Sequence, residues 1–177
     1  MRLFVGVEPT PDFRAALADL QTRLLAAGAE GRYLPPSNLH MTLAFIGEWP
    51  EDVTEILPAV PKPFSVTLSG LGVFTGAKVL WAGVRPSPEL NGLAAEVRKR
   101  LETAEIPYDR QSFNPHMTLI RKPVLPDGGI LTSVQAPPVS MTVKEVCLYR
   151  SVHEAEGMKY TVIGRSGGNA GPENKKE

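Results

Sequence analysis

The chain contains only three histidines, and two of them occupy the same place in a repeated tetrapeptide. His-Met-Thr-Leu occurs at residues 40–43 and again at residues 116–119. Histidine can accept or donate a proton near neutral pH, so two histidines can supply both a base and an acid. The threonine hydroxyl two residues later can donate to an anionic oxygen or orient the ring. The repeat therefore indicates acid–base chemistry at a site that also binds negative charge.

Both copies are predicted to lie on β-strands, where side chains alternate between the two faces. His40 and Thr42 then share one face, and His116 and Thr118 share the corresponding face of the second strand. The apolar residues between them point to the core. If the two strands belong to related lobes, the two pairs meet across a cleft. One imidazole would be neutral and the other protonated.

Other interpretations of the same residues are weaker. A single His-x-Thr in a strand is usually a half-buried polar pair without a function, and it is the repetition that argues for one. A zinc site lacks an obvious third ligand and the helical spacing of paired histidines. Nucleophilic catalysis lacks a serine in an elbow motif, and Cys147 lies in an apolar run that predicts a buried thiol.

The composition sets limits on the class of protein. Apolar residues make up 42% and charged residues 21% of the 177 residues, which is typical of a soluble globular protein. The formal net charge is zero, which argues against broad binding to long nucleic acids. The single cysteine excludes an internal disulfide and fits a reducing compartment. With no signal peptide or membrane-length apolar segment, we expect a cytoplasmic protein, and a monomer.

Two helices begin with a capping residue followed by proline, at Thr10 and at Ser87, and a shorter helix is expected within residues 50–60. Strands are predicted at residues 2–7, 39–46, 64–70, 79–84, 115–121, 141–150 and 158–164. This order favours an α+β fold with mainly antiparallel sheets. We expect one bilobal domain over residues 1–165, with pseudo-symmetric lobes at roughly 1–80 and 81–165 that are open to an exchange of terminal strands. Residues 166–177 are predicted to be a disordered tail.

The flanks of the tetrapeptides carry a resemblance to a known family. NLHMTLAFIGE at residues 38–48 and FNPHMTLIR at residues 113–121 closely resemble the paired His-x-Thr motifs of the 2H phosphoesterase superfamily. Within it, the match is to the RNA 2′,3′-cyclic phosphodiesterases, also called 2′-5′ RNA ligases or the LigT-like family. Residues 2–7, 71–84 and 143–164 resemble the opening, middle and closing strands of that family, so the resemblance covers nearly the whole chain.

The resemblance implies flanking helices and a central cleft that holds both histidines, with no metal and no cofactor. The implied reaction is hydrolysis of the 2′,3′-cyclic phosphate at the end of an RNA or nucleoside to a 2′-phosphate. His40 is then the proton donor and His116 the proton acceptor, while Thr42, Thr118 and Arg121 bind substrate. Alternatives are reversible 2′-5′ ligation of RNA halves and a non-catalytic module that binds nucleotides or RNA ends.

Strict alternation creates one conflict with these roles. Counted from His116, Arg121 falls on the face opposite the cleft. It reaches the substrate only if a bulge, the end of the strand or the length of its side chain brings it there, and otherwise it is structural. The same count places Phe45 in the core, and the apolar neighbours of Trp81 predict that this ring is buried.

Overall fold

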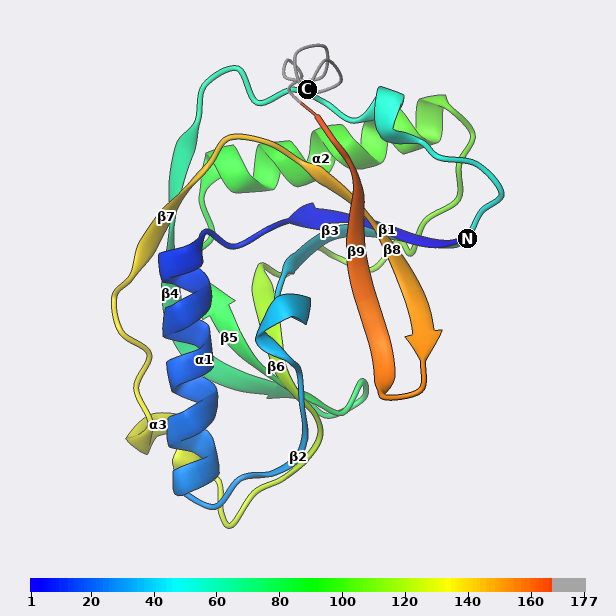
Figure 1. Ribbon diagram of the computed structural model, residues 1–177. Helices are drawn as coiled ribbons and strands as arrows, with labels where there is room; N and C mark the ends of the chain where they lie inside the picture. The colour runs from blue at the N-terminus through cyan, green and yellow to red at the C-terminus, as the bar shows by residue number, and fades with distance from the viewer. Residues whose placement is uncertain (167–177) are drawn as a thin grey trace.

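Nine β-strands in residues 1–166, the part of the chain that the computed structural model describes, form two antiparallel sheets (Figure 1). The first sheet has the order β3-β1-β8-β9 and the second has the order β2-β6-β5-β4-β7. The strands are β1 (Arg2–Val7), β2 (Glu30–Tyr33), β3 (Met41–Glu48), β4 (Phe64–Phe74), β5 (Val79–Val84), β6 (His116–Val124), β7 (Ser140–Val143), β8 (Cys147–Glu154) and β9 (Gly157–Arg165). The α+β class with antiparallel sheets is therefore confirmed.

Two helices of 16 residues, α1 (Pro11–Ala26) and α2 (Pro88–Thr103), begin as the sequence predicts. The hydroxyl of Thr10 accepts from the N–H of Phe13, and that of Ser87 accepts from the N–H of Leu90. Each helix follows a strand of one sheet and packs on the other sheet. α1 follows β1 and contacts β6 and β7, whereas α2 follows β5 and contacts β3. Figure 1 shows the two helices at different ends of the molecule. A short helix, α3 (Ile130–Ser133), precedes β7.

The two sheets repeat one arrangement of strands. In the first sheet, β3 lies beside β1, which leads into α1, and in the second sheet β6 lies beside β5, which leads into α2. The order β3-β1-β8-β9 thus corresponds to β6-β5-β4-β7, with β2 added beside β6. The sequence repeats with it, since Gly-Val-Glu-Pro-Thr-Pro at 6–11 becomes Gly-Val-Arg-Pro-Ser-Pro at 83–88.

The division of the chain differs from the lobes expected at 1–80 and 81–165. The first sheet combines β1 and β3 with β8 and β9, and β2 and β4 lie with the later strands in the second sheet. The single strand predicted at 141–150 is also wrong. It is interrupted at residues 144–146, and β7 and β8 belong to different sheets. The helix expected within 50–60 is only a 3₁₀ turn, Thr54–Ile56.

Most of the buried apolar side chains form one contiguous core that spans both sheets and both long helices, and Phe4, Cys147 and Tyr149 form a smaller cluster. Val5 and Leu43 come from the first sheet, and Leu80 and Ile120 come from the second. Ser166, the first residue of the predicted tail, is buried. Its N–H donates to the carbonyl of Val146, the residue before β8, and its hydroxyl accepts from the N–H of Val146. The remainder of that predicted tail, 167–177, lies outside the described residues. None of the helices in 1–166 has the length and apolar character needed to cross a membrane.

Candidate active site

A β-bulge interrupts β3, the strand that begins directly after His40, three residues after the histidine. Gly6 of β1 pairs with Thr42 of β3, but the next residue of β1, Val5, pairs with Ala44. Leu43 is therefore an extra residue in β3. A bulge of this kind reverses the alternation of side chains beyond it.

The second histidine-bearing strand has its bulge at the same offset. Trp81 of β5 pairs with Thr118 of β6, but Leu80 pairs with Ile120, so Leu119 is the extra residue. Leu119 and Ile120 are consequently both buried. Leu119 is the third residue after His116, just as Leu43 is the third after His40.

These bulges decide which side chains face the cleft. Beyond Leu119, Arg121 returns to the face of His116 and Thr118, which resolves the conflict in the sequence in favour of a bulge. Beyond Leu43, Phe45 likewise joins the face of Thr42, so its predicted place in the core is wrong. Phe45 is half-buried and lines a pocket with Thr42 and His116. Phe45 and Arg121 thus occupy equivalent positions, each five residues after a histidine.

Each bulge is held by a side chain from the helix that crosses over from the other sheet. The amide nitrogen of Gln21 on α1 donates to the carbonyl of Leu119 at 3.0 Å and to that of Leu34 at 2.8 Å. The guanidinium of Arg98 on α2 donates to the carbonyl of Leu43 at 3.1 Å. Gln21 and Arg98 both lie ten residues after the first proline of their helix. The buried amide of Gln21 therefore has a specific structural role.

The two imidazoles are held in the same tautomer. Nδ1 of His40 lies 2.8 Å from the carbonyl oxygen of Asn38, and Nδ1 of His116 lies 2.6 Å from that of Asn114. A carbonyl can only accept, so Nδ1 carries the hydrogen in both rings and Nε2 is left for proton transfer. The asparagine two residues before each histidine extends the sequence repeat to Asn-x-His-Met-Thr-Leu.

His40 is packed among aromatic rings. Its ring centroid lies 4.6 Å from that of Phe4, 5.4 Å from Tyr149 and 5.2 Å from Tyr160, and Nε2 lies 3.1 Å from the Thr42 hydroxyl oxygen. Burial lowers the pKa of His40 to about 4, although the Asn38 carbonyl acts in the opposite direction. The ring is therefore neutral at neutral pH in the free protein.

His116 lies on the opposite wall, in a more open setting. Phe74 packs edge-on against it at 5.0 Å and Trp81 lies 6.1 Å away, so the ring of Trp81 is half-buried on the cleft face. Burial lowers the pKa of His116 as well. The pocket that His116 lines, together with Thr42 and Phe45 of the first sheet, has a volume of about 790 Å³. Thr118 is half-buried on the same face of β6.

Arg121 connects the two walls. Its guanidinium donates to the hydroxyl of Tyr160 on β9 at 2.8 Å, and the ring of Tyr160 stands edge-on to His40. The charges of Arg121 and His116 both lower the pKa of His40, so both groups lie within electrostatic range of His40. The structure therefore brings His40, Thr42, His116 and Arg121 around a common space.

Sequence reasoning missed the residue that fixes the approach to His40. Asn38 ends a 3₁₀ turn, Pro36–Asn38, and is buried. Its side-chain amide donates to the carbonyl of Met158 at 2.8 Å and accepts from the N–H of Tyr160 at 3.2 Å, which ties the turn to β9. The asparagine shared by both copies of the motif is the signal that could have revealed it. Asn114 differs, because its side chain is exposed and lines the pocket.

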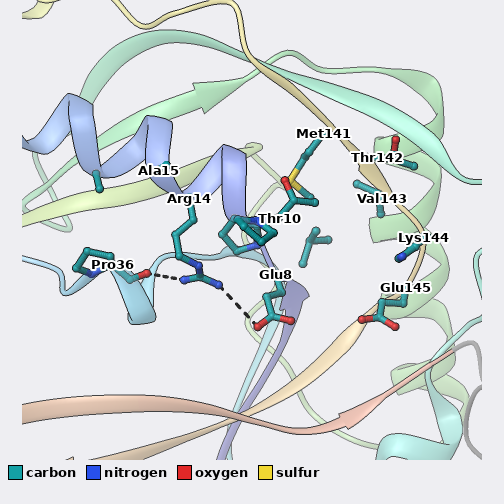
Figure 2. A pocket seen from close by; sticks show the side chains of 14 residues that line it. Glu8, Thr10, Arg14, Ala15, Pro36, Met141, Thr142, Val143, Lys144 and Glu145 are labelled. Atoms are coloured by element: carbon teal, nitrogen blue, oxygen red, sulfur yellow. Dashed lines mark hydrogen bonds and ion pairs between the residues drawn. The ribbon is translucent and has the colours of Figure 1, made fainter. Parts of the chain in front are cut away.

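A second cavity, of about 670 Å³, lies at the start of α1 and is separate from the histidine pocket (Figure 2). Figure 2 shows Arg14 between Glu8, at 3.7 Å, and the carbonyl of Pro36, which ties α1 to the turn before His40. Near this cavity, Glu8, Glu145 and Cys147 offer possible metal-ligand atoms within 4.8 Å of one another. The Arg165 guanidinium donates to both carboxylates, at 2.8 and 2.6 Å, and supplies a cation there.

Comparison with known proteins gives a consistent result. The model of the 2′-5′ RNA ligase superfamily matches residues 9–155. The chain is 26% identical to the RNA 2′,3′-cyclic phosphodiesterase of Thermotoga maritima, over 92% of the chain and 93% of that protein. It is 31% identical to the Thermus thermophilus protein of the same name, over 92% of the chain and 88% of that protein.

Among solved structures, Escherichia coli LigT complexed with 3′-AMP matches with a TM-score of 0.74 and 27% identity, over 93% of the chain and 95% of LigT. The family match covers most of the chain and includes both His-Met-Thr-Leu motifs, at residues 40–43 and 116–119. The chain belongs to the 2′-5′ RNA ligase superfamily.

Proposed function

We propose that this protein hydrolyses the 2′,3′-cyclic phosphate at the end of an RNA or nucleoside to a 2′-phosphate, with His40 and His116 as its acid and base. The observation that carries the proposal is the pair of imidazoles whose Nδ1 atoms are both tied to backbone carbonyls, which leaves two Nε2 atoms for proton transfer. The names of the relatives in Thermotoga maritima and Thermus thermophilus support this substrate class.

The reaction needs one proton acceptor and one proton donor. Nε2 of His116 takes a proton from water as the water oxygen bonds to phosphorus. The bond from phosphorus to the 3′-oxygen breaks, and Nε2 of His40 gives that oxygen a proton. Water is consumed, one ribose hydroxyl is released, and the phosphate remains on the 2′-oxygen. Proton transfer to and from positioned side chains of this kind accelerates reactions by roughly 10²–10⁴-fold.

Three polar groups are proposed to bind the phosphate. The hydroxyls of Thr42 and Thr118 donate to its non-bridging oxygens, where negative charge develops in the transition state. Arg121, already within hydrogen-bond distance of Tyr160, offers a guanidinium fork that suits a phosphate. None of these steps uses a metal ion or a cofactor. The single buried, free cysteine fits a reducing compartment, and we propose that the protein is cytoplasmic and acts as a monomer.

The low pKa of His40 places a condition on its role as the acid. In the free protein this ring is neutral at neutral pH, because burial disfavours its charged form. A bound phosphodiester carries a negative charge, and a negative charge nearby favours the protonated ring. Substrate binding is therefore expected to bring a proton to the pair of histidines.

The test uses a short RNA that ends in a 2′,3′-cyclic phosphate, incubated with the protein in EDTA. We expect a 2′-phosphate as the product, and we expect His40→Ala and His116→Ala each to lower kcat at least about a hundredfold. The third histidine, His153, is exposed near the end of β8, so His153→Ala is the matched control and should keep wild-type turnover. Near-normal turnover in either of the first two variants would contradict the mechanism.

The same assay separates the alternatives. Joining of two RNA halves through a 2′-5′ bond is the reverse use of the site, in which a 5′-hydroxyl replaces water. It would appear as a longer product when RNA with a free 5′-hydroxyl is added. Binding of the cyclic end without any new product would identify a non-catalytic module and would overturn the proposed hydrolysis.

A further inference from the structure

We infer that Arg32 and Arg121 together form a second anion-binding subsite, which binds the phosphate attached to the 5′-oxygen of the terminal nucleotide. The inference rests on the proposed function and deepens it. It makes the preferred substrate an RNA chain, because a nucleoside 2′,3′-cyclic phosphate has no charge at that position. The subsite depends on β2, the strand that has no counterpart in the first sheet.

The register of β2 on β6 puts the two arginines side by side. Arg32 pairs directly with Arg121 in this antiparallel ladder. Directly opposed residues of neighbouring strands project from the same face, with Cβ atoms about 4.5–5.5 Å apart. The bulge at Leu119 turns Arg121 to the cleft face, so Arg32 faces the cleft as well.

Two like charges in this position are unfavourable without a counter-charge. Both side chains are exposed, and neither forms an ion pair with a carboxylate anywhere in residues 1–166. Next to Arg121, the backbone N–H of Lys122 donates to the carbonyl of Lys78 at 2.8 Å. Lys78 and Lys122 adopt the left-handed backbone conformation, with φ of 56° and 52° respectively, which is unusual for residues with side chains. A bound phosphate would supply the missing counter-charge.

The position of the pair fits the phosphate that precedes the reacting one. Tyr160 lies between Arg121 and His40. Its hydroxyl accepts from the Arg121 guanidinium, and its ring packs edge-on against the His40 imidazole. Arg32 lies one strand further from His40, and neighbouring strands are about 4.8 Å apart. Arg121 can thus contact the reacting phosphate, and Arg32 extends the positive charge along the chain in one direction.

The first sheet offers no equivalent path. Its corresponding strand, β3, which begins directly after His40, is an edge strand, and within residues 1–166 no strand pairs with it in the place that β2 takes beside β6. The residue equivalent to Arg121 is Phe45, which is apolar, and the Arg98 guanidinium that lines the same pocket already donates to the carbonyls of Leu43 and Gln111. A chain of phosphates that leaves the catalytic pair is therefore drawn toward β2 and β6. The guanidinium group suits this role better than an ammonium, since its planar fork can hold two phosphate oxygens at once.

The experiment compares three substrates with the wild-type protein and Arg32→Gln. The substrates are a nucleoside 2′,3′-cyclic phosphate, the same compound with a 5′-phosphate, and a dinucleotide with the same cyclic end. We expect Arg32→Gln to lower kcat/KM about tenfold on the last two and less than about twofold on the first. Arg32→Lys should recover part of the loss, and the slope of log(kcat/KM) against log[salt] should become shallower by up to about one for the dinucleotide.

Lys99→Gln is the matched control, because Lys99 is an exposed cation on α2 that lines no part of the histidine pocket. It should leave all three substrates unchanged. Equal losses of Arg32→Gln on all three substrates, or no loss on any, would overturn the subsite. A loss confined to the 5′-phosphorylated nucleoside would show a site for terminal phosphates and would overturn the RNA-chain inference. If the wild-type protein cleaves none of the three, the proposed function itself fails, which is a separate result.

Discussion

At the scale of single residues, the site combines two imidazoles that share a tautomer but not an environment. His40 is enclosed by Phe4, Tyr149 and Tyr160, whereas His116 lies in an open pocket. Burial lowers both pKa values, that of His40 to about 4. The protonated form of either ring is therefore scarce in the free protein at neutral pH.

This scarcity predicts how activity depends on pH. The reaction needs one protonated and one neutral imidazole, and a group with a lowered pKa loses its proton at lower pH. We expect kcat/KM, which reports the free protein, to fall as pH rises above about 6.5, by up to tenfold per unit. We expect kcat to persist to higher pH, because bound phosphate raises the imidazole pKa values.

Both profiles can be measured with a nucleoside 2′,3′-cyclic phosphate, which lacks any other titrating group near this range. The two apparent pKa values belong to the coupled pair of rings. A kcat/KM that rises from pH 6.5 to 8 would contradict the lowered pKa values. A kcat profile identical to that of kcat/KM would contradict proton uptake on binding.

Much of this residue-scale picture could be predicted from the sequence. The scarcity of histidine and the repeat of His-Met-Thr-Leu identified His40 and His116 as the candidate pair. The environment of each ring could not be predicted, because Tyr149 and Tyr160 come from strands that follow the first motif by more than 100 residues. Neither tyrosine has a sequence pattern that places it beside His40.

At the scale of elements, the bulges in β3 and β6 decide what faces the cleft. Strict alternation gave the right face for Thr42 and Thr118, which precede the bulges, and the wrong face for Phe45 and Arg121, which follow them. A bulge is fixed by its partners as much as by its own residues. The Leu119 carbonyl accepts from the Leu34 N–H and from the Gln21 side chain, which lies 98 positions earlier, so the local sequence carries little sign of the bulge.

Gln21→Met tests the role of the hydrogen bonds from Gln21 to the carbonyls of Leu34 and Leu119. The substitution keeps the length of the side chain and removes both hydrogen-bond donors. The buried carbonyl of Leu34 loses the amide that it accepts from, so we expect a loss of about 1–3 kcal/mol in the free energy of unfolding. We also expect a lower kcat/KM, because Arg121 is no longer firmly turned to the cleft. Urea unfolding and steady-state kinetics measure the two effects.

A double-mutant cycle separates positioning from general damage. If Gln21 acts through Arg121, the change Arg121→Gln should lower kcat/KM much less in the Gln21→Met background than in the wild type. Gln135→Met, at an exposed residue before β7, is the control and should change neither quantity. Strictly additive losses would show that Gln21 serves stability alone.

At the scale of the whole molecule, the chain crosses repeatedly between the sheets. Each long helix leaves one sheet and clamps the bulge of the other, and one core spans both. The repeat in the sequence predicted two related lobes. It could not predict which helix covers which sheet, because both amphipathic helices have similar apolar stripes and both start with a capping hydroxyl followed by proline.

Because the chain crosses between the sheets and one core spans both, we expect that neither sheet unfolds without the other. Trp49 follows β3 in the first sheet, and Trp81 lies in β5 of the second, so each tryptophan reports one sheet. Trp81→Phe and Trp49→Phe each leave a single reporter. We expect the fluorescence transition of each variant in urea to coincide with its own circular-dichroism transition. A fluorescence midpoint that departs from the circular-dichroism midpoint in either variant would show lobes that unfold independently.

The equivalence of Phe45 and Arg121 has a consequence for polarity. A perfectly twofold catalytic pair would accept a ribose either way round and would assign its histidines at random. Here one wall offers the Phe45 ring, with the Arg2 guanidinium carbon 4.8 Å from its centroid, and the opposite wall offers the Arg121 guanidinium. We expect a nucleobase to stack on the first wall and a phosphate to be drawn to the second. The substrate then enters in a single direction, and this direction decides which ribose oxygen each imidazole meets.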